Sequence, residues 1–183
     1  MFVPVWDENS LKSIRFQFVT VALIVVNIVV FAFEALSLPQ QAIASFAVVP
    51  AELFPSVATS PPLASGVVVP ERLTLLTYMF FHGDIIHLGS NMLFLWVFGD
   101  NVEDSMGHVK FLAFYLLCGI AGGLAHAWLL PTSAIPLIGA SGAIAGVIAA
   151  YLMLHPRVQV WVLVLRFLPV RLSAAIVLGL WVA

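Results

Sequence analysis

Residues 135–148 read IPLIGASGAIAGVI, and the interpretation of the whole chain depends on this stretch. Ser141 stands among small residues, and no charged side chain lies near it in the stretch. Gly142 and Gly146 are four positions apart, a spacing that lets two membrane helices approach closely. A serine in such a setting is either a packing residue or a nucleophile, and the stretch taken alone favours packing.

The composition places this stretch in a membrane. Of the 183 residues, 62% are hydrophobic and 9% are charged, whereas about 25% of the residues in a soluble domain are charged. Too little polar surface remains to cover a globule in water, so we predict an all-α, polytopic bundle of membrane helices with the lipid bilayer as a partner. The net charge of −2 and the absence of a basic cluster argue against nucleic-acid binding.

Apolar runs predict five helices, separated by segments with a different composition. The proline-rich stretch 37–73 is expected to be an outer loop with short helical pieces. Residues 158–170 are expected to form an interfacial amphipathic connection, and Gly83-Asp84 is a candidate break in the second helix. The predicted helices cover residues 16–33, 74–102, 109–130, 139–154 and 172–183.

The expected organisation is a cytoplasmic segment at 1–15 followed by an incomplete membrane domain at 16–183. The last predicted helix has twelve residues, which span ~18 Å against ~30 Å of hydrocarbon. No charge or cap follows its end at Ala183, so we expect the chain to be truncated there.

The distribution of basic residues predicts the orientation. With the N-terminus in the cytoplasm, six of the seven Lys and Arg residues lie on the inner side, and Arg72 alone lies outside. This arrangement satisfies the positive-inside rule. It puts Ser141, His82 and His87 near the outer ends of their helices, at a similar depth.

His87 and Asn91 share one helix face because they are four residues apart. Their simplest role is to form interhelical hydrogen bonds, since unpaired polar groups are costly in lipid. The spacing also suits two donors that converge on a small anion. Zinc is disfavoured because no HExxH motif and no third ligand are present.

GASG at 139–142, together with His87-x-x-x-Asn91, resembles the rhomboid intramembrane serine proteases. The run 98–104, FGDNVED, and the pair Gly107-His108 are also similar to bacterial members of that family. The resemblance implies a six-helix core, of which about five helices would be present here. It also implies a bacterial cytoplasmic membrane, with the site toward the outer face.

The resemblance implies a role for each matching residue. Ser141 would be the nucleophile, His87 and Asn91 would stabilise the oxyanion with the backbone N–H of Ser141, and His82 would shape the site. Gly139 and Gly142 would flank the serine. The implied reaction is peptide-bond hydrolysis through an acyl-enzyme on single-pass transmembrane substrates, without a metal or cofactor.

Two departures from the family pattern keep an alternative open. The stretch 71–74 lacks the Trp-Arg pair that the family loop often carries, and the general-base histidine of a sixth helix is not in this chain. His126 is interpreted as a packing or interfacial residue, and His108 and His155 fall on the cytoplasmic side. The alternatives are a catalytically inactive rhomboid-like protein that binds transmembrane helices and, less favoured, a small transporter or channel.

Overall fold

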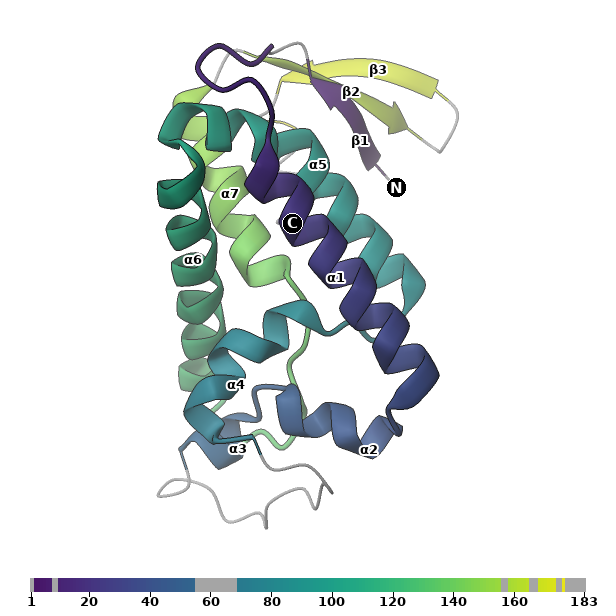
Figure 1. Ribbon diagram of the computed structural model, residues 1–183, viewed down its shortest axis with the longest axis vertical. Helices are drawn as coiled ribbons and strands as arrows, with labels where there is room; N and C mark the ends of the chain where they lie inside the picture. Colours follow the sequence, from purple (N-terminus) through teal and green to yellow (C-terminus); the bar gives the residue numbers. More distant parts are fainter. Residues whose placement is uncertain are drawn as a thin grey trace.

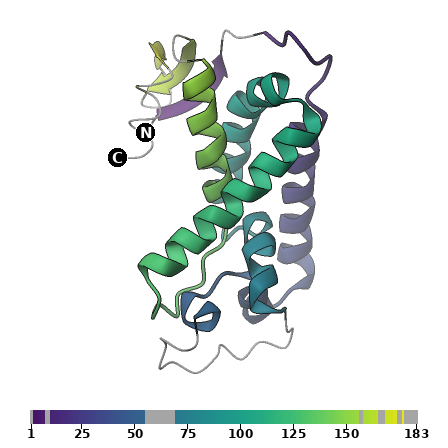
Figure 2. The same ribbon diagram turned by 90° about the vertical axis from the view of Figure 1, so that its left-hand side faces the viewer.

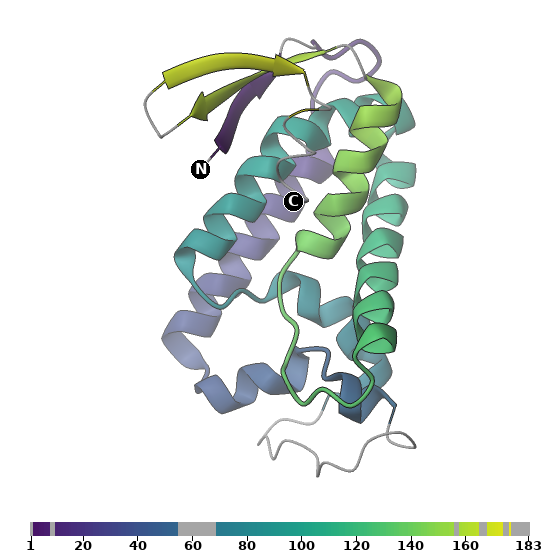
Figure 3. The same ribbon diagram turned by 180° about the vertical axis from the view of Figure 1, so that it is seen from behind.

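Four long helices lie side by side in the part of the chain that the structure describes. The computed structural model describes residues 2–7, 10–54, 69–155, 158–164, 168–173 and 176. Helix α7 packs against both α6 and α5, and α1 lies along α5 (Figures 1, 2 and 3). The long helices are α1 (Phe18–Ser37), α5 (Ile85–Met106), α6 (His108–Leu129) and α7 (Ser141–Leu154).

Short helical pieces gather at one end of the bundle, where the expected outer loop folds against it (Figure 1). Short pieces were expected within 37–73, but two of them extend into 74–80, which was predicted to belong to the second helix; residues 55–68 lie outside the description. The pieces are α2 (Gln40–Ile43), η1 (Ala44–Phe46), α3 (Pro50–Leu53), α4 (Glu71–Thr77) and η2 (Tyr78–Phe80).

A three-stranded antiparallel sheet lies at the opposite end of the bundle (Figures 1 and 3). Its strands are β1 (Phe2–Asp7), β2 (Gln159–Val164) and β3 (Leu168–Ser173), in the order β1-β2-β3. Phe2 stands opposite Val164, so the N-terminal segment is joined to a segment far along the chain. The sheet and the short outer pieces therefore mark the two ends of the helical bundle.

The sheet corrects three of the predictions. The structure is mostly helical, but it is not all-α, because residues 159–164 form β2 and residues 168–170 begin β3, where an amphipathic connection was expected. Leu172 likewise lies in β3 and does not begin a fifth helix; residues 177–183 are outside the described ranges. The physical signal is the period-two pattern of a run rich in β-branched residues: Val160 and Val162 are buried while Gln159 is exposed.

The predicted second helix is divided, and the candidate break is confirmed. The backbone leaves the helical conformation after η2 and re-enters it at α5. The Asp84 carboxylate begins α5 by accepting hydrogen bonds from the N–H groups of Ile86 and His87, each at 2.8 Å. An aspartate at this position satisfies N–H groups that have no partner within the helix.

Two described helices, α1 and α6, are long and apolar enough to cross a membrane. Only 22% of the apolar window of each is buried within the protein. A core helix of a soluble protein hides most of its apolar surface, so these two helices instead present apolar side chains outward. Helix α7 is apolar but shorter.

Two acidic residues at the end of α5 secure the beginning of α1. Gln17 provides no side-chain cap for α1. Instead, Glu103 accepts hydrogen bonds from the backbone N–H groups of Val19 (2.9 Å) and Thr20 (2.7 Å) and from the Thr20 hydroxyl (2.7 Å). Asp104 accepts three more from backbone N–H groups at residues 12–14. The run 99–104, GDNVED, thus holds the start of α1 in place through its last two residues.

Candidate functional site

Ser141 is the first residue of α7, and α7 begins on the side of the bundle that faces the short helical pieces (Figure 1). The segment that leads to it is tied to the outer loop, because Leu137 and Val48 exchange two backbone hydrogen bonds of 2.8 and 3.0 Å. No side chain caps α7, and its first helical hydrogen bond joins the N–H of Ile144 to the carbonyl of Ala140. The N–H of Ser141 is therefore free of a helical partner and available to an anion.

Gly139 has a positive φ of 119°, which a residue with a side chain rarely adopts. Its backbone also lies against the His87 ring: a β-carbon placed on it would be 2.7 Å from both Cε1 and Nε2 of His87. The same β-carbon would be 3.7 Å from Nδ2 of Asn91. The structure thus brings the two predicted donors to the turn that precedes Ser141.

His82 completes this polar group from the segment before α5. Its side chain is fully buried, and its Nε2 lies 3.0 Å from Nδ2 of Asn91. With the amide nitrogen as the donor, Nε2 accepts, and the proton of the neutral ring is on Nδ1. Asn91 then keeps its second N–H for another acceptor. The rings of His82 and His87 meet edge to face at 5.2 Å between centroids.

The position of His87 depends on the start of α5. Its backbone N–H donates to Asp84, and this hydrogen bond is the main reason why the pKa of the Asp84 carboxyl lies below its ordinary value. The carboxylate is charged at neutral pH and favours the positive end of the helix dipole. The first turn of α5, which carries His87, is held in this way.

The glycines of the GASG stretch also pack helices, as the spacing suggested. A β-carbon on Gly142 would be 2.9 Å from the Tyr78 hydroxyl oxygen and 3.5 Å from the α-carbon of Gly122. Gly146 lies directly against Cys118 of α6. The packing interpretation of the stretch is therefore confirmed, because these small residues let α7 approach α6.

Tyr78 is a site residue that the sequence reasoning missed. Its hydroxyl donates to the carbonyl of Gly119 at 2.6 Å, and its own carbonyl accepts from the N–H of Gly139 at 2.9 Å. It therefore links α6 to the turn before Ser141. Its position four residues before His82 and the concentration of glycines in α6 were the available signals, but neither specifies a contact.

The remaining histidines lie elsewhere. His155 follows the last residue of α7, a 14-residue helix away from Ser141, which is ~21 Å. His108 begins α6 and contacts Glu103 at 2.5 Å. His126 lies in the last turn of α6. Within the described ranges, no group of three or more metal-ligating side chains is found.

Comparisons with known proteins identify the family of this chain. The model of the Rhomboid domain matches residues 70–183, more than half of the chain. Rhomboid protein 1, mitochondrial, of Saccharomyces cerevisiae is 35% identical over 96 residues, and rhomboid protease GluP of Bacillus subtilis is 43% identical over 82 residues. Inactive rhomboid protein 1 of Drosophila melanogaster is 34% identical over 90 residues.

These matches cover 50%, 45% and 49% of this chain, but only 28%, 16% and 6% of the three relatives. The chain thus spans less than a third of the length of each of these relatives. The names include both a protease and an inactive protein, and one protein of mitochondria. Rhomboid proteins are integral to membranes, and this chain belongs to the rhomboid family.

Proposed function

We propose that this protein is an intramembrane serine endopeptidase that cleaves single-pass membrane proteins in or near their transmembrane segments. In this proposal it is a multi-pass protein of a bacterial cytoplasmic membrane, its N-terminus is cytoplasmic, and the site opens toward the outer face. The observation that supports it best is that His87 and Asn91 lie beside the backbone of Gly139, two residues before Ser141 at the start of α7.

The chemistry begins when the Ser141 hydroxyl oxygen attacks the substrate carbonyl carbon. The carbonyl oxygen becomes negatively charged, and donors already in place stabilise this charge without reorganisation. Collapse of the tetrahedral intermediate breaks the C–N bond and leaves an ester on Ser141, and the proton that a base took from the serine hydroxyl passes to the leaving nitrogen, which departs as the amine. Water then attacks the ester, which frees the serine and the acid product.

Ser141 needs a base that accepts its proton, since a serine hydroxyl is a weak nucleophile. None of the hydrogen bonds found among the described residues joins Ser141 to a histidine. This observation supports a second candidate function, a catalytically inactive rhomboid-like protein that binds transmembrane helices. The inactive Drosophila relative is a precedent for that class.

The two candidates give different results with a transmembrane reporter and a serine-directed fluorophosphonate in proteoliposomes. The protease should cleave the reporter and react with the probe, and Ser141→Ala should abolish both. Asn91→Ala should lower kcat by ~10²–10³, the cost of removing one oxyanion donor. Cleavage that survives Ser141→Ala would refute the proposal, and reporter binding without cleavage or labelling would establish the inactive protein.

A further inference from the structure

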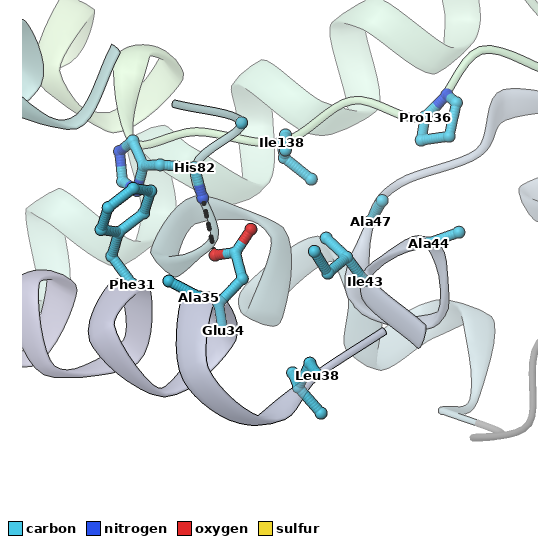
Figure 4. Close-up of a pocket in the computed structure, with 11 residues that line it drawn as sticks. Phe31, Glu34, Ala35, Leu38, Ile43, Ala44, Ala47, His82, Pro136 and Ile138 are labelled. Atoms are coloured by element: carbon cyan, nitrogen blue, oxygen red, sulfur yellow. Dashed lines mark hydrogen bonds between the residues drawn. The ribbon is translucent and has the colours of Figure 1, made fainter. Parts of the chain in front are cut away.

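A cavity of about 450 Å³ adjoins the candidate site on the side of α1 (Figure 4). Its walls come from the end of α1, from the segment that contains α2 and η1, and from the stretch 136–138. Most of the lining is apolar, including Phe31, Ile43 and Ile138. The cavity therefore has room for a long side chain whose body is hydrocarbon.

Glu34 places a carboxylate in this apolar surrounding. The residue is 6% exposed, and one of its oxygens accepts a hydrogen bond from the backbone N–H of His82 at 3.4 Å. The second oxygen points away from His82, into the cavity (Figure 4). Among the described residues, no Lys or Arg forms an ion pair with Glu34. Glu34 is the one acidic residue of the lining.

The cavity and the candidate site share a wall. His82 lines the cavity and also contacts Asn91 through its ring, and Ile138 lines the cavity directly before Gly139. An extended polypeptide advances ~3.3 Å per residue and turns alternate side chains to the same side. A substrate with its reacting carbonyl beside Gly139 can therefore place a side chain in the cavity a few residues away.

The chemistry of the lining selects the side chain. A buried carboxylate without a cation is costly, and an apolar side chain that displaced its water would raise the cost. Lysine and arginine instead bring a hydrocarbon stem for the walls and a charge for the carboxylate. We propose that this cavity is a substrate subsite that selects a lysine or arginine side chain, with Glu34 as the specificity-determining residue. This inference rests on the proposed function.

Binding to the Ser141→Ala protein tests the subsite without turnover. The full chain in lipid nanodiscs is titrated with fluorescent transmembrane peptides that carry a single lysine, or norleucine, at successive positions on the outer side of the scissile bond. At one position, the lysine peptide should bind on the order of tenfold more tightly, as expected for a charge-assisted hydrogen bond. Lack of a lysine preference at every position would overturn the inference, as would failure of both peptides to bind.

Substitutions separate the charge of Glu34 from its hydrogen bond. Glu34→Gln keeps an oxygen for the N–H of His82 and should bring the lysine-to-norleucine ratio to about 1. Glu34→Lys should favour a glutamate peptide. Glu52→Lys, which makes the same charge change in α3 at the same end of the bundle, should leave the ratio unchanged. A ratio that persists in Glu34→Gln would assign Glu34 to the positioning of His82 alone and refute the subsite.

The outcomes for the two proposals are distinguishable. Cleavage of a norleucine reporter by the wild-type protein, combined with no lysine preference, refutes the subsite and leaves the protease intact. Lysine-selective binding that disappears in Glu34→Gln supports the subsite even where the wild-type protein cleaves nothing. Thermal unfolding of each variant confirms that the comparison is made between folded proteins.

Discussion

The imidazole ring of His87 lies directly against the backbone of Gly139. These residues belong to different segments, and a β-carbon on the glycine would be 2.7 Å from two ring atoms. The contact places a ring nitrogen beside the turn that presents Ser141. It also makes position 139 sensitive for two reasons, since the φ of 119° already disfavours any side chain.

Gly139→Ala should therefore abolish the proposed activity, because the new methyl group displaces His87 and the backbone is strained. Gly89→Ala is the matched control: a β-carbon at that position meets nothing within 4 Å. It should keep activity and stabilise α5 by about 0.5–1 kcal/mol, the difference between glycine and alanine in a helix. Equal activities of the two variants in the reporter assay would show that the His87–Gly139 contact is dispensable.

Gly142→Ala should destabilise the packing of α7 on α6 by about 1–3 kcal/mol, the usual cost of overpacking. The nearest atom to the new methyl group is the hydroxyl oxygen of Tyr78, at 2.9 Å. Tyr78→Phe removes that oxygen and loses its hydrogen bond to Gly119, which costs about 1 kcal/mol. The double variant should lose less free energy of unfolding than the two single variants lose together, as measured by unfolding in detergent micelles. Strict additivity of the two losses would show that the strain in Gly142→Ala does not come from contact with the Tyr78 hydroxyl.

Glu103→Ala should release the beginning of α1, because three donors at Val19 and Thr20 lose their acceptor. A lost cap costs about 1 kcal/mol, and buried donors left unpaired cost about 1–3 kcal/mol each. Hydrogen exchange at the amides of Val19 and Thr20 should accelerate, whereas exchange at Leu117 in the middle of α6 should not. Thr20→Val, which removes only the hydroxyl donor, should have a smaller effect.

The start of α5 should weaken in acid. The pKa of Asp84 in the folded protein lies below its ordinary value of about 3.9, chiefly through the N–H of His87. Its contribution to stability is therefore complete above that value and is lost as the pH falls through the folded pKa. A plot of melting temperature against pH should fall below about pH 4. Asp84→Asn, which caps the helix without titrating, should flatten that part of the curve. An unchanged curve would assign the acid sensitivity to other carboxyls.

Local spacing predicted much of the site. The i, i+4 relation put His87 and Asn91 on one face of α5, and small residues around Ser141 indicated both close packing and an open turn. The path of the backbone could not be predicted in this way, because the contact of His87 with Gly139 depends on how the segment after α6 returns to α7. Tyr78 escaped notice for the same reason: its role rests on contacts with Gly119 and Gly139, which are distant in sequence.

Hydropathy predicted α6 and α7 to within two residues and α1 to within four, because long apolar runs have few other solutions in a membrane. It failed for β2 and β3, where a run interrupted by Arg166 and Arg171 indicated an amphipathic connection. The capping of α1 by Glu103 was also beyond prediction. The residues that it serves are more than eighty positions earlier, and no pattern within either segment identifies the other.

The pairing of Phe2 with Val164 has a consequence for how the chain folds during its synthesis. A ribosome adds about 5–20 residues per second, so β1 emerges on the order of ten seconds before its partner exists. During that interval helices α1 to α7 have to be placed, while β1 exposes unpaired backbone groups that could join another chain. Because β1 is synthesised long before β2, it stays unpaired until β2 emerges. A nascent chain would therefore need another contact to shield β1 until then.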